Sequence, residues 1–153
     1  MTTLSMFLLG PFQATLSPEP LTDFRTRKVQ ALLIYLAAEP EAHSRDSLLN
    51  LFWPGLPEKS ARSNLRQILY YLRQIVPEAG EDGRPDTPVI IANRQEIQLN
   101  PQADVCVDTR QFVAHLDHSQ VHEHLDLTLC RECAAELEQA VSLYRGEIGR
   151  AHV

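Results

Sequence analysis

The sequence predicts an α+β fold, a winged helix-turn-helix followed by a short α-helical segment. Three observations favour it. Short strand-like stretches open the chain over residues 4–16, three amphipathic helical patterns follow over residues 26–76, and a second strand pair lies at residues 88–99. N-terminal antiparallel strands, three helices with a short link between the second and third, and a C-terminal β-hairpin wing form a winged helix-turn-helix in that order.

The first strand pair and the first two helices each have a local reason. Gly10-Pro11 interrupts the opening stretch and predicts a turn between two strands. From about Thr26, apolar residues recur at three- and four-residue spacing, which predicts a helix that ends near Pro40. Ser44 is a suitable N-cap for a second, short helix that ends before Pro54-Gly55, because proline cannot continue the hydrogen-bond ladder.

The third helix is expected over residues 57–76, with Pro57 at its start. Residues 78–87 lack apolar periodicity and are expected to form a loop. The helical spacing predicts a buried stripe of Ala61, Leu65, Ile68, Leu69, Leu72 and Val76.

Residues 88–99 are expected to form the wing. A two-residue turn at Asn93-Arg94 would close this hairpin, with Arg94 at its tip to reach a minor groove or a phosphate. The alternative is that Arg94 is simply a solvent-exposed residue of the turn. The expected register places Ile90 opposite Ile97 and Pro88 opposite Leu99.

The segment after residue 100 is expected to hold two helices. Asp108 is a suitable cap for the first, with Gln111 reaching back to it. The second is expected from about Leu129 to Gly146. The predicted apolar side consists of Val105, Phe112, Val113 and Leu116 in the first, and Cys130, Cys133, Leu137, Ala140, Val141 and Tyr144 in the second.

Composition places the chain among ordinary globular proteins. It has 153 residues, of which 44% are hydrophobic and 22% charged, so it can bury a core. The longest apolar run, residues 31–38, is far shorter than the roughly 18 to 20 residues that span a membrane. The N-terminus has no basic start and no small-residue cleavage site. We therefore expect a cytoplasmic protein without a membrane partner.

The net charge of −6 is unevenly distributed along the chain. Residues 101–153 carry four arginines against nine acidic residues, whereas residues 21–76 carry eight basic against five acidic residues. A basic face and an acidic appendage can share one chain, so the net charge does not exclude nucleic acid.

One face of the third helix carries cations without interleaved acids, since no Asp or Glu lies between Glu58 and Glu78. Arginine can bind guanine bidentately, and asparagine or glutamine can bind adenine, so this face suits a major groove. Arg27 and Lys28 are placed to contact phosphates. The alternative is a solvated helix face, because Arg and Lys are good helix formers. The face consists of Lys59, Arg62, Arg66, Tyr70 and Arg73, with Ser63, Asn64, Gln67 and Gln74 beside it.

A second constellation consists of His122, His124, Cys130 and Cys133. It has the ligand types and number of a closed tetrahedral zinc site, which would be structural. The alternative is that both cysteines are small buried hydrophobes, so no cofactor is required. The sequence has no G-x-x-x-x-G-K-S/T loop, no G-x-S-x-G and no H-E-x-x-H, and we predict no enzyme.

Residues 27–55 and 61–76 resemble the winged-helix segment of the Streptomyces antibiotic regulatory protein (SARP) family, which shares the OmpR/PhoB-type DNA-binding fold. The run Phe52-Trp53-Pro54 and the run Asn64-Leu65-Arg66-Gln67 are the most specific points. Residues 105–112 and 143–147 resemble the opening of the bacterial transcriptional activator domain that follows in that family.

The resemblance implies a transcriptional activator. Residues 1–100 would be its winged-helix DNA-binding domain, and residues 101–153 the truncated start of a tetratricopeptide-like activator domain. Such proteins place the third helix in the major groove of double-stranded DNA, often on promoter repeats bound by a dimer or in tandem, and recruit RNA polymerase. The competing hypothesis is a protein-interaction module on a winged-helix scaffold that does not bind DNA, which the negative net charge favours.

Overall fold

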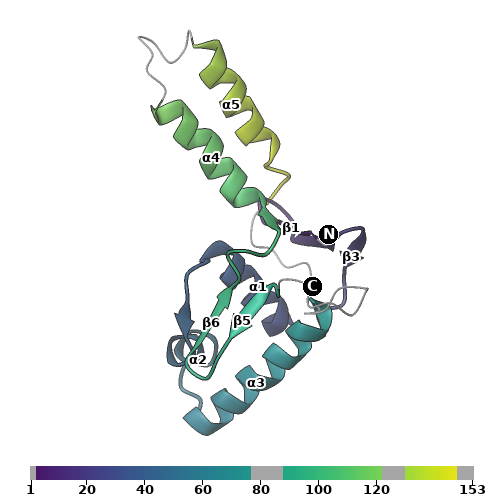
Figure 1. Cartoon of the computed structure of the whole chain (residues 1–153), viewed down its shortest axis with the longest axis vertical. Helices are drawn as coiled ribbons and strands as arrows, with labels where there is room; N and C mark the ends of the chain where they lie inside the picture. Colours follow the sequence, from purple (N-terminus) through teal and green to yellow (C-terminus); the bar gives the residue numbers. More distant parts are fainter. Residues whose placement is uncertain (1–2, 77–87, 122–129, 148–153) are drawn as a thin grey trace.

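The computed structural model describes residues 3–76, 88–121 and 130–147. Figure 1 shows two parts: a lower body in which helices pack with short strands, and a helical hairpin that projects from it. Among the described residues, no helix is both long and apolar enough to cross a membrane.

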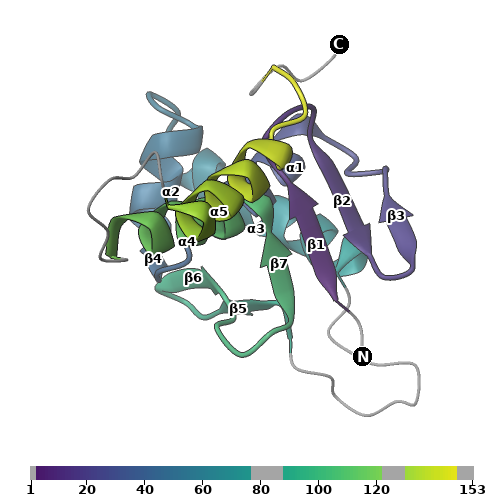
Figure 2. The ribbon, with the colours of Figure 1, turned by 90° about the horizontal axis from the view of Figure 1, so that it is seen from above.

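The first sheet is built around the N-terminus. Its strands are β1 (Leu4–Phe7), β2 (Gln13–Leu16), β3 (Glu19–Leu21) and β7 (Val105–Val107), in the order β3-β2-β1-β7 (Figure 2). β1 and β2 are antiparallel, with Leu4 opposite Leu16, which confirms the expected strand pair. β3 was not expected. β7 lies beyond residue 100 and pairs in parallel with β1, so the segment just before α4 shares a sheet with the N-terminal strand.

The three expected helices are confirmed as α1 (Arg27–Ala38), α2 (Arg45–Phe52) and α3 (Glu58–Ile75). Thr26 Oγ1 accepts a hydrogen bond from the Val29 backbone N–H at 3.3 Å and caps α1. Ser44 Oγ accepts one from Ser47 N at 3.1 Å and caps α2, as predicted. Pro57 occupies the N-cap of α3 without a side-chain hydrogen bond.

One hydrophobic core joins these elements. It contains Leu4 of β1, Leu33 of α1, Leu72 of α3 and Val107 of β7, each at most 1% exposed. The predicted stripe of α3 lies in this core, and every residue of it is buried. Burial of one face of α3 leaves its opposite face to the solvent.

The second sheet contains the predicted wing. β4 (His43–Ser44), β6 (Glu96–Leu99) and β5 (Ile90–Ala92) lie in the order β4-β6-β5. The expected hairpin exists, but its expected register is wrong. The structure places Ile90 opposite Leu99 and Ala92 opposite Ile97, so the turn lies one residue later than expected. Ile90, Ile97 and Leu99 are all buried, because the pairs shift by two residues and the same side chains still face the core.

The helical hairpin is formed by α4 (Asp108–Val121) and α5 (Arg131–Ser142) (Figure 1). α5 is shorter than expected at both ends. Its residue Val141 is 69% exposed, Val113 of α4 is 52% exposed, and Tyr144 beyond α5 is 55% exposed, so their predicted burial is wrong. The two helices pack mainly against each other, so side chains outside that contact stay in the solvent.

Asp108 has a different role from the predicted one. Its carboxylate accepts hydrogen bonds from the backbone N–H groups of Leu8 and Leu9, at 2.8 and 3.0 Å, and thereby joins the start of α4 to the end of β1. Gln111 donates to Cys106 Sγ instead of reaching back to a cap. Arg110 donates to the Ala37 carbonyl at 2.8 Å, which ties α4 to the end of α1.

Candidate nucleic-acid interface

The solvent face of α3 carries the residues that the sequence singles out. Because the opposite stripe is buried in the core, α3 cannot rotate to hide this face. The face runs the length of the helix and presents cations and hydrogen-bonding side chains on one side. Its exposed members are Lys59, Arg62, Ser63, Arg66, Gln67, Tyr70, Arg73 and Gln74, and Asn64 is half-buried.

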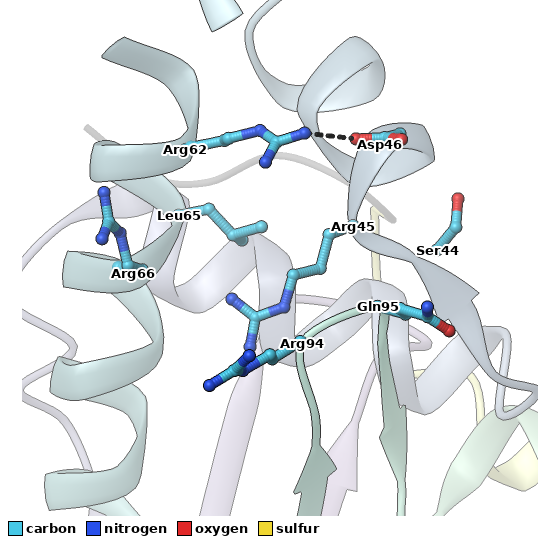
Figure 3. Close-up of a pocket in the computed structure, with 8 residues that line it drawn as sticks. All are labelled: Ser44, Arg45, Asp46, Arg62, Leu65, Arg66, Arg94 and Gln95. Carbon is cyan, nitrogen blue, oxygen red and sulfur yellow. Dashed lines mark ion pairs between the residues drawn. The ribbon is translucent and has the colours of Figure 1, made fainter. Parts of the chain in front are cut away.

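Four arginines surround a hollow of about 670 Å³ between α3, the start of α2 and the tip of the wing (Figure 3). Arg62 and Arg66 come from α3, Arg45 from α2 and Arg94 from the wing. The fold therefore brings Arg94 beside α3, as a wing residue requires. Ser44, Asp46, Leu65 and Gln95 complete the lining.

Arg45 is the member of this cluster that the sequence did not single out. Its Nε donates to the Asn93 carbonyl at 2.8 Å, and its backbone N–H donates to the Gln95 carbonyl at 2.8 Å. Burial and then the positive charges of Arg73 and Arg66 lower its pKa. A guanidinium held beside other cations marks a site of positive potential, which favours an anion.

The turn of the wing is shaped by Asn93. Its Oδ1 accepts hydrogen bonds from the backbone N–H groups of Gln95 and Glu96, both at 2.8 Å, and its own N–H donates to the Glu96 carbonyl at 3.0 Å. Asn93 is thus the residue before the turn, and Arg94-Gln95 are the two residues at the tip. Arg94 stays at the tip in the corrected register.

Arg62 contacts two carboxylates. Its Nη2 lies 2.5 Å from Glu58 Oε1, one turn earlier on α3, and 3.5 Å from Asp46 Oδ1 of α2. The part of α3 that lacks acidic residues therefore begins directly after Glu58, the nearer carboxylate partner of Arg62. Arg66, one turn further along α3, lines the hollow as well (Figure 3).

The two predicted phosphate contacts at the start of α1 lie outside the four-arginine hollow. Lys28 Nζ donates to the Phe52 carbonyl at 2.7 Å and lies 5.4 Å from the centre of the Trp53 ring, so it joins α1 to the end of α2. Arg27 is exposed and lines a separate hollow beside β2 and β3.

The predicted zinc ligands are only partly within the described residues. His122 and His124 lie outside them. Cys130 caps α5 through a hydrogen bond that its Sγ accepts from Cys133 N at 3.5 Å, and Cys133 is buried. Within the ranges that the structure describes, no group of three or more His, Cys, Asp or Glu could hold a metal ion. Zinc stays a prediction, which metal analysis of protein purified without a chelator tests.

A comparison with solved structures identifies the fold. EmbR of Mycobacterium tuberculosis, solved in complex with a low-affinity phosphopeptide, matches with a TM-score of 0.73 and 24% sequence identity. The match covers 97% of this chain and 38% of the EmbR chain. The fold is an OmpR/PhoB-type winged helix-turn-helix.

In this winged helix-turn-helix, α2 and α3 form the helix-turn-helix and β5-β6 form the wing. α3 occupies the place that the recognition helix has in this fold. No family model matches the sequence, and neither does any curated protein. Membership of the SARP family therefore stays a prediction.

Proposed function

We propose that the chain is a sequence-specific DNA-binding module of a bacterial, cytoplasmic transcriptional activator. α3, within the predicted recognition helix 57–76, would enter the major groove, and the wing at residues 88–99 would contact the minor groove or the backbone. The observation that carries the proposal is the convergence of Arg45, Arg66 and Arg94 from three separate elements on one hollow.

The two kinds of contact would be divided between these elements. Arg45 and Arg94 lie at the rim formed by α2 and the wing, where a phosphate would be neutralised and its counterions released. Arg66 and Gln67 lie on the exposed face of α3, where a recognition helix meets base edges. Phosphate contacts would supply affinity and the α3 residues would supply selectivity.

The acidic segment beyond the wing would serve protein contacts. Its hairpin of α4 and α5 projects from the body that carries α3 (Figure 1). RNA polymerase is the partner that we propose for this part, with a dimer or tandem copies on promoter repeats. The chain spans 38% of the EmbR chain, so the activity of a longer regulator is also a proposal.

Selection from a random pool of DNA duplexes tests the proposal. We expect one motif to be enriched by the wild-type chain and not by the Arg66→Ala variant. Arg131→Ala, an exposed arginine on α5, is the matched control and should enrich the same motif. If the wild-type chain enriches no motif, the protein-interaction module that the net charge of −6 favours becomes the better account.

A further inference from the structure

Glu58 is an acid at the start of α3, beside the cationic face that we propose for DNA, and the first residues of a recognition helix contact base edges. It lies in the first turn of α3 and its side chain is 68% exposed. Phosphates repel a carboxylate, so an acid at this place lowers the affinity for any duplex. The N-terminus of a helix stabilises negative charge, which explains why the acid is tolerated there but not what it contacts.

The ion pair with Arg62 gives this acid a defined position. Glu58 Oε1 lies 2.5 Å from Arg62 Nη2, one helical turn away, so the guanidinium orients the carboxylate. Asp46 Oδ1 approaches the same nitrogen at 3.5 Å from α2 (Figure 3). The side chains of both pairs are exposed, so a ligand can reach them in these positions.

An oriented carboxylate in the major groove has a specific chemistry. It accepts hydrogen bonds and cannot donate one, so it matches the N4 amino group of cytosine. It is repelled by O6 and N7 of guanine and by O4 of thymine, which are acceptors. The neighbouring guanidinium has the opposite preference and matches guanine. Side by side, the two groups discriminate between bases better than either cation or acid alone.

We infer that Glu58 is a specificity-determining residue that accepts a hydrogen bond from a cytosine amino group, and that Arg62 is its positioning residue. This inference rests on the proposed function, because it requires α3 to lie in a major groove. It adds to that function a negatively charged residue, Glu58, that contacts a base edge.

Motif selection with Glu58→Gln tests the inference. Glutamine keeps the size of the side chain but can donate as well as accept, so it no longer rejects acceptor edges. We expect the motif to relax at one C·G position, by about 10-fold in relative affinity, with the other positions unchanged. We also expect tighter binding to a scrambled duplex, because one repulsive charge has been removed.

Two variants separate base reading from charge alone. Asp46→Asn also removes one negative charge, at the carboxylate that lies 3.5 Å from Arg62. This variant should bind all duplexes more tightly, and its selected motif should stay unchanged. Glu138→Gln removes an exposed charge on α5, away from α3, and should change neither quantity (Figure 1). Circular dichroism confirms that each variant is folded.

The outcomes distinguish this inference from the proposed function. If the wild-type chain enriches no motif, the proposed function fails and the inference falls with it. If the wild-type chain enriches a motif that Glu58→Gln leaves unchanged, only the inference fails. Relaxation at an A·T position instead of a C·G position would also overturn it, since no cytosine is present there.

Discussion

Arg45 Nε donates to the Asn93 carbonyl at 2.8 Å, so the start of α2 is joined to the tip of the wing. The two residues are 48 positions apart in the sequence. The same arginine lines the hollow with Arg94 and two arginines of α3. One side chain therefore holds the wing beside α2 and contributes charge to the surface between the wing and α3.

Arg45→Ala is expected to weaken binding to every duplex to a similar extent. The variant loses one cation of the hollow and the contact that positions Arg94. We expect the slope of log affinity against log salt to fall by about 1 in magnitude, as for the loss of one phosphate contact. Titrations of the selected duplex and a scrambled duplex at several salt concentrations measure both slopes. A loss confined to the selected duplex would make Arg45 a base reader instead.

Arg66→Ala is expected to cost about 1 to 3 kcal/mol of binding to the selected duplex and much less for a scrambled one. The reason is that Arg66, exposed on α3, reads a base edge under the proposed function. Fluorescence anisotropy with both duplexes measures the difference, and Arg131→Ala is the control. Equal binding by the variant and the wild-type chain would place the reading site elsewhere.

Asp108→Ala is expected to destabilise the fold by about 2 to 4 kcal/mol, because it leaves the N–H groups of Leu8 and Leu9 without their acceptor. Asp108 is 3% exposed, so water cannot replace the carboxylate without rearrangement. Urea unfolding measures the free energy. Asp117→Ala, an exposed acid of the same helix, should change it by less than about 0.5 kcal/mol. Equal effects of the two variants would contradict the assigned role.

The pair between α4 and α5 predicts a pH dependence. His115 Nδ1 donates to Glu136 Oε2 at 2.5 Å, and this hydrogen bond holds the pKa of Glu136 below its ordinary value of 4.5. A carboxyl whose pKa is lower in the folded state stabilises the fold above the unfolded value, and this contribution is lost as the pH falls through the lowered pKa.

Thermal unfolding of the wild-type chain and of Glu136→Gln, from neutral pH to below 4.5, tests this dependence. We expect the wild-type chain to be the more stable at neutral pH and the two curves to converge in acid. A difference that persists unchanged in acid would show that the contact acts by packing and not by charge.

Burial raises the pKa of the Cys133 thiol to about 11, so it is protonated at neutral pH and should react slowly with iodoacetamide. Cys130, at the N-cap of α5, is less buried and should react first. Trypsin cleaves after Arg131 and separates the two cysteines, so mass spectrometry can follow each one. Equal rates of alkylation in the presence of a chelator would contradict the burial of Cys133.

The three helices α1, α2 and α3 could be predicted because residues close together in the sequence determine them. The apolar spacing of α3 has one solution, since only one face of an 18-residue helix carries Leu65, Leu69 and Leu72. The caps at Thr26 and Ser44 are likewise readable from single residues. Once these helices are set, the exposed face of α3 follows without further information.

The predictions that were wrong or incomplete concern features that are decided by contacts between residues far apart in the sequence. The turn of the wing could not be placed, because a shift of the strand pairs by two residues keeps Ile90 and Ile97 facing the core. Only the hydrogen bonds that Asn93 accepts decide it. Arg45 lies in the site because it contacts Asn93, a residue 48 positions away that the local sequence does not indicate. The sequence around Asp108 indicates only a cap, because it does not reveal that the end of β1 lies beside this residue.

Sequence-specific DNA binding is tested most directly by the affinity of the wild-type chain for its selected duplex and for a scrambled duplex of equal length, at two salt concentrations. If α3 and the wing read a DNA sequence, the selected duplex binds at least about 10³-fold more tightly and salt weakens both complexes. Equal, weak affinities with no steep salt dependence would contradict sequence-specific DNA binding by α3 and the wing.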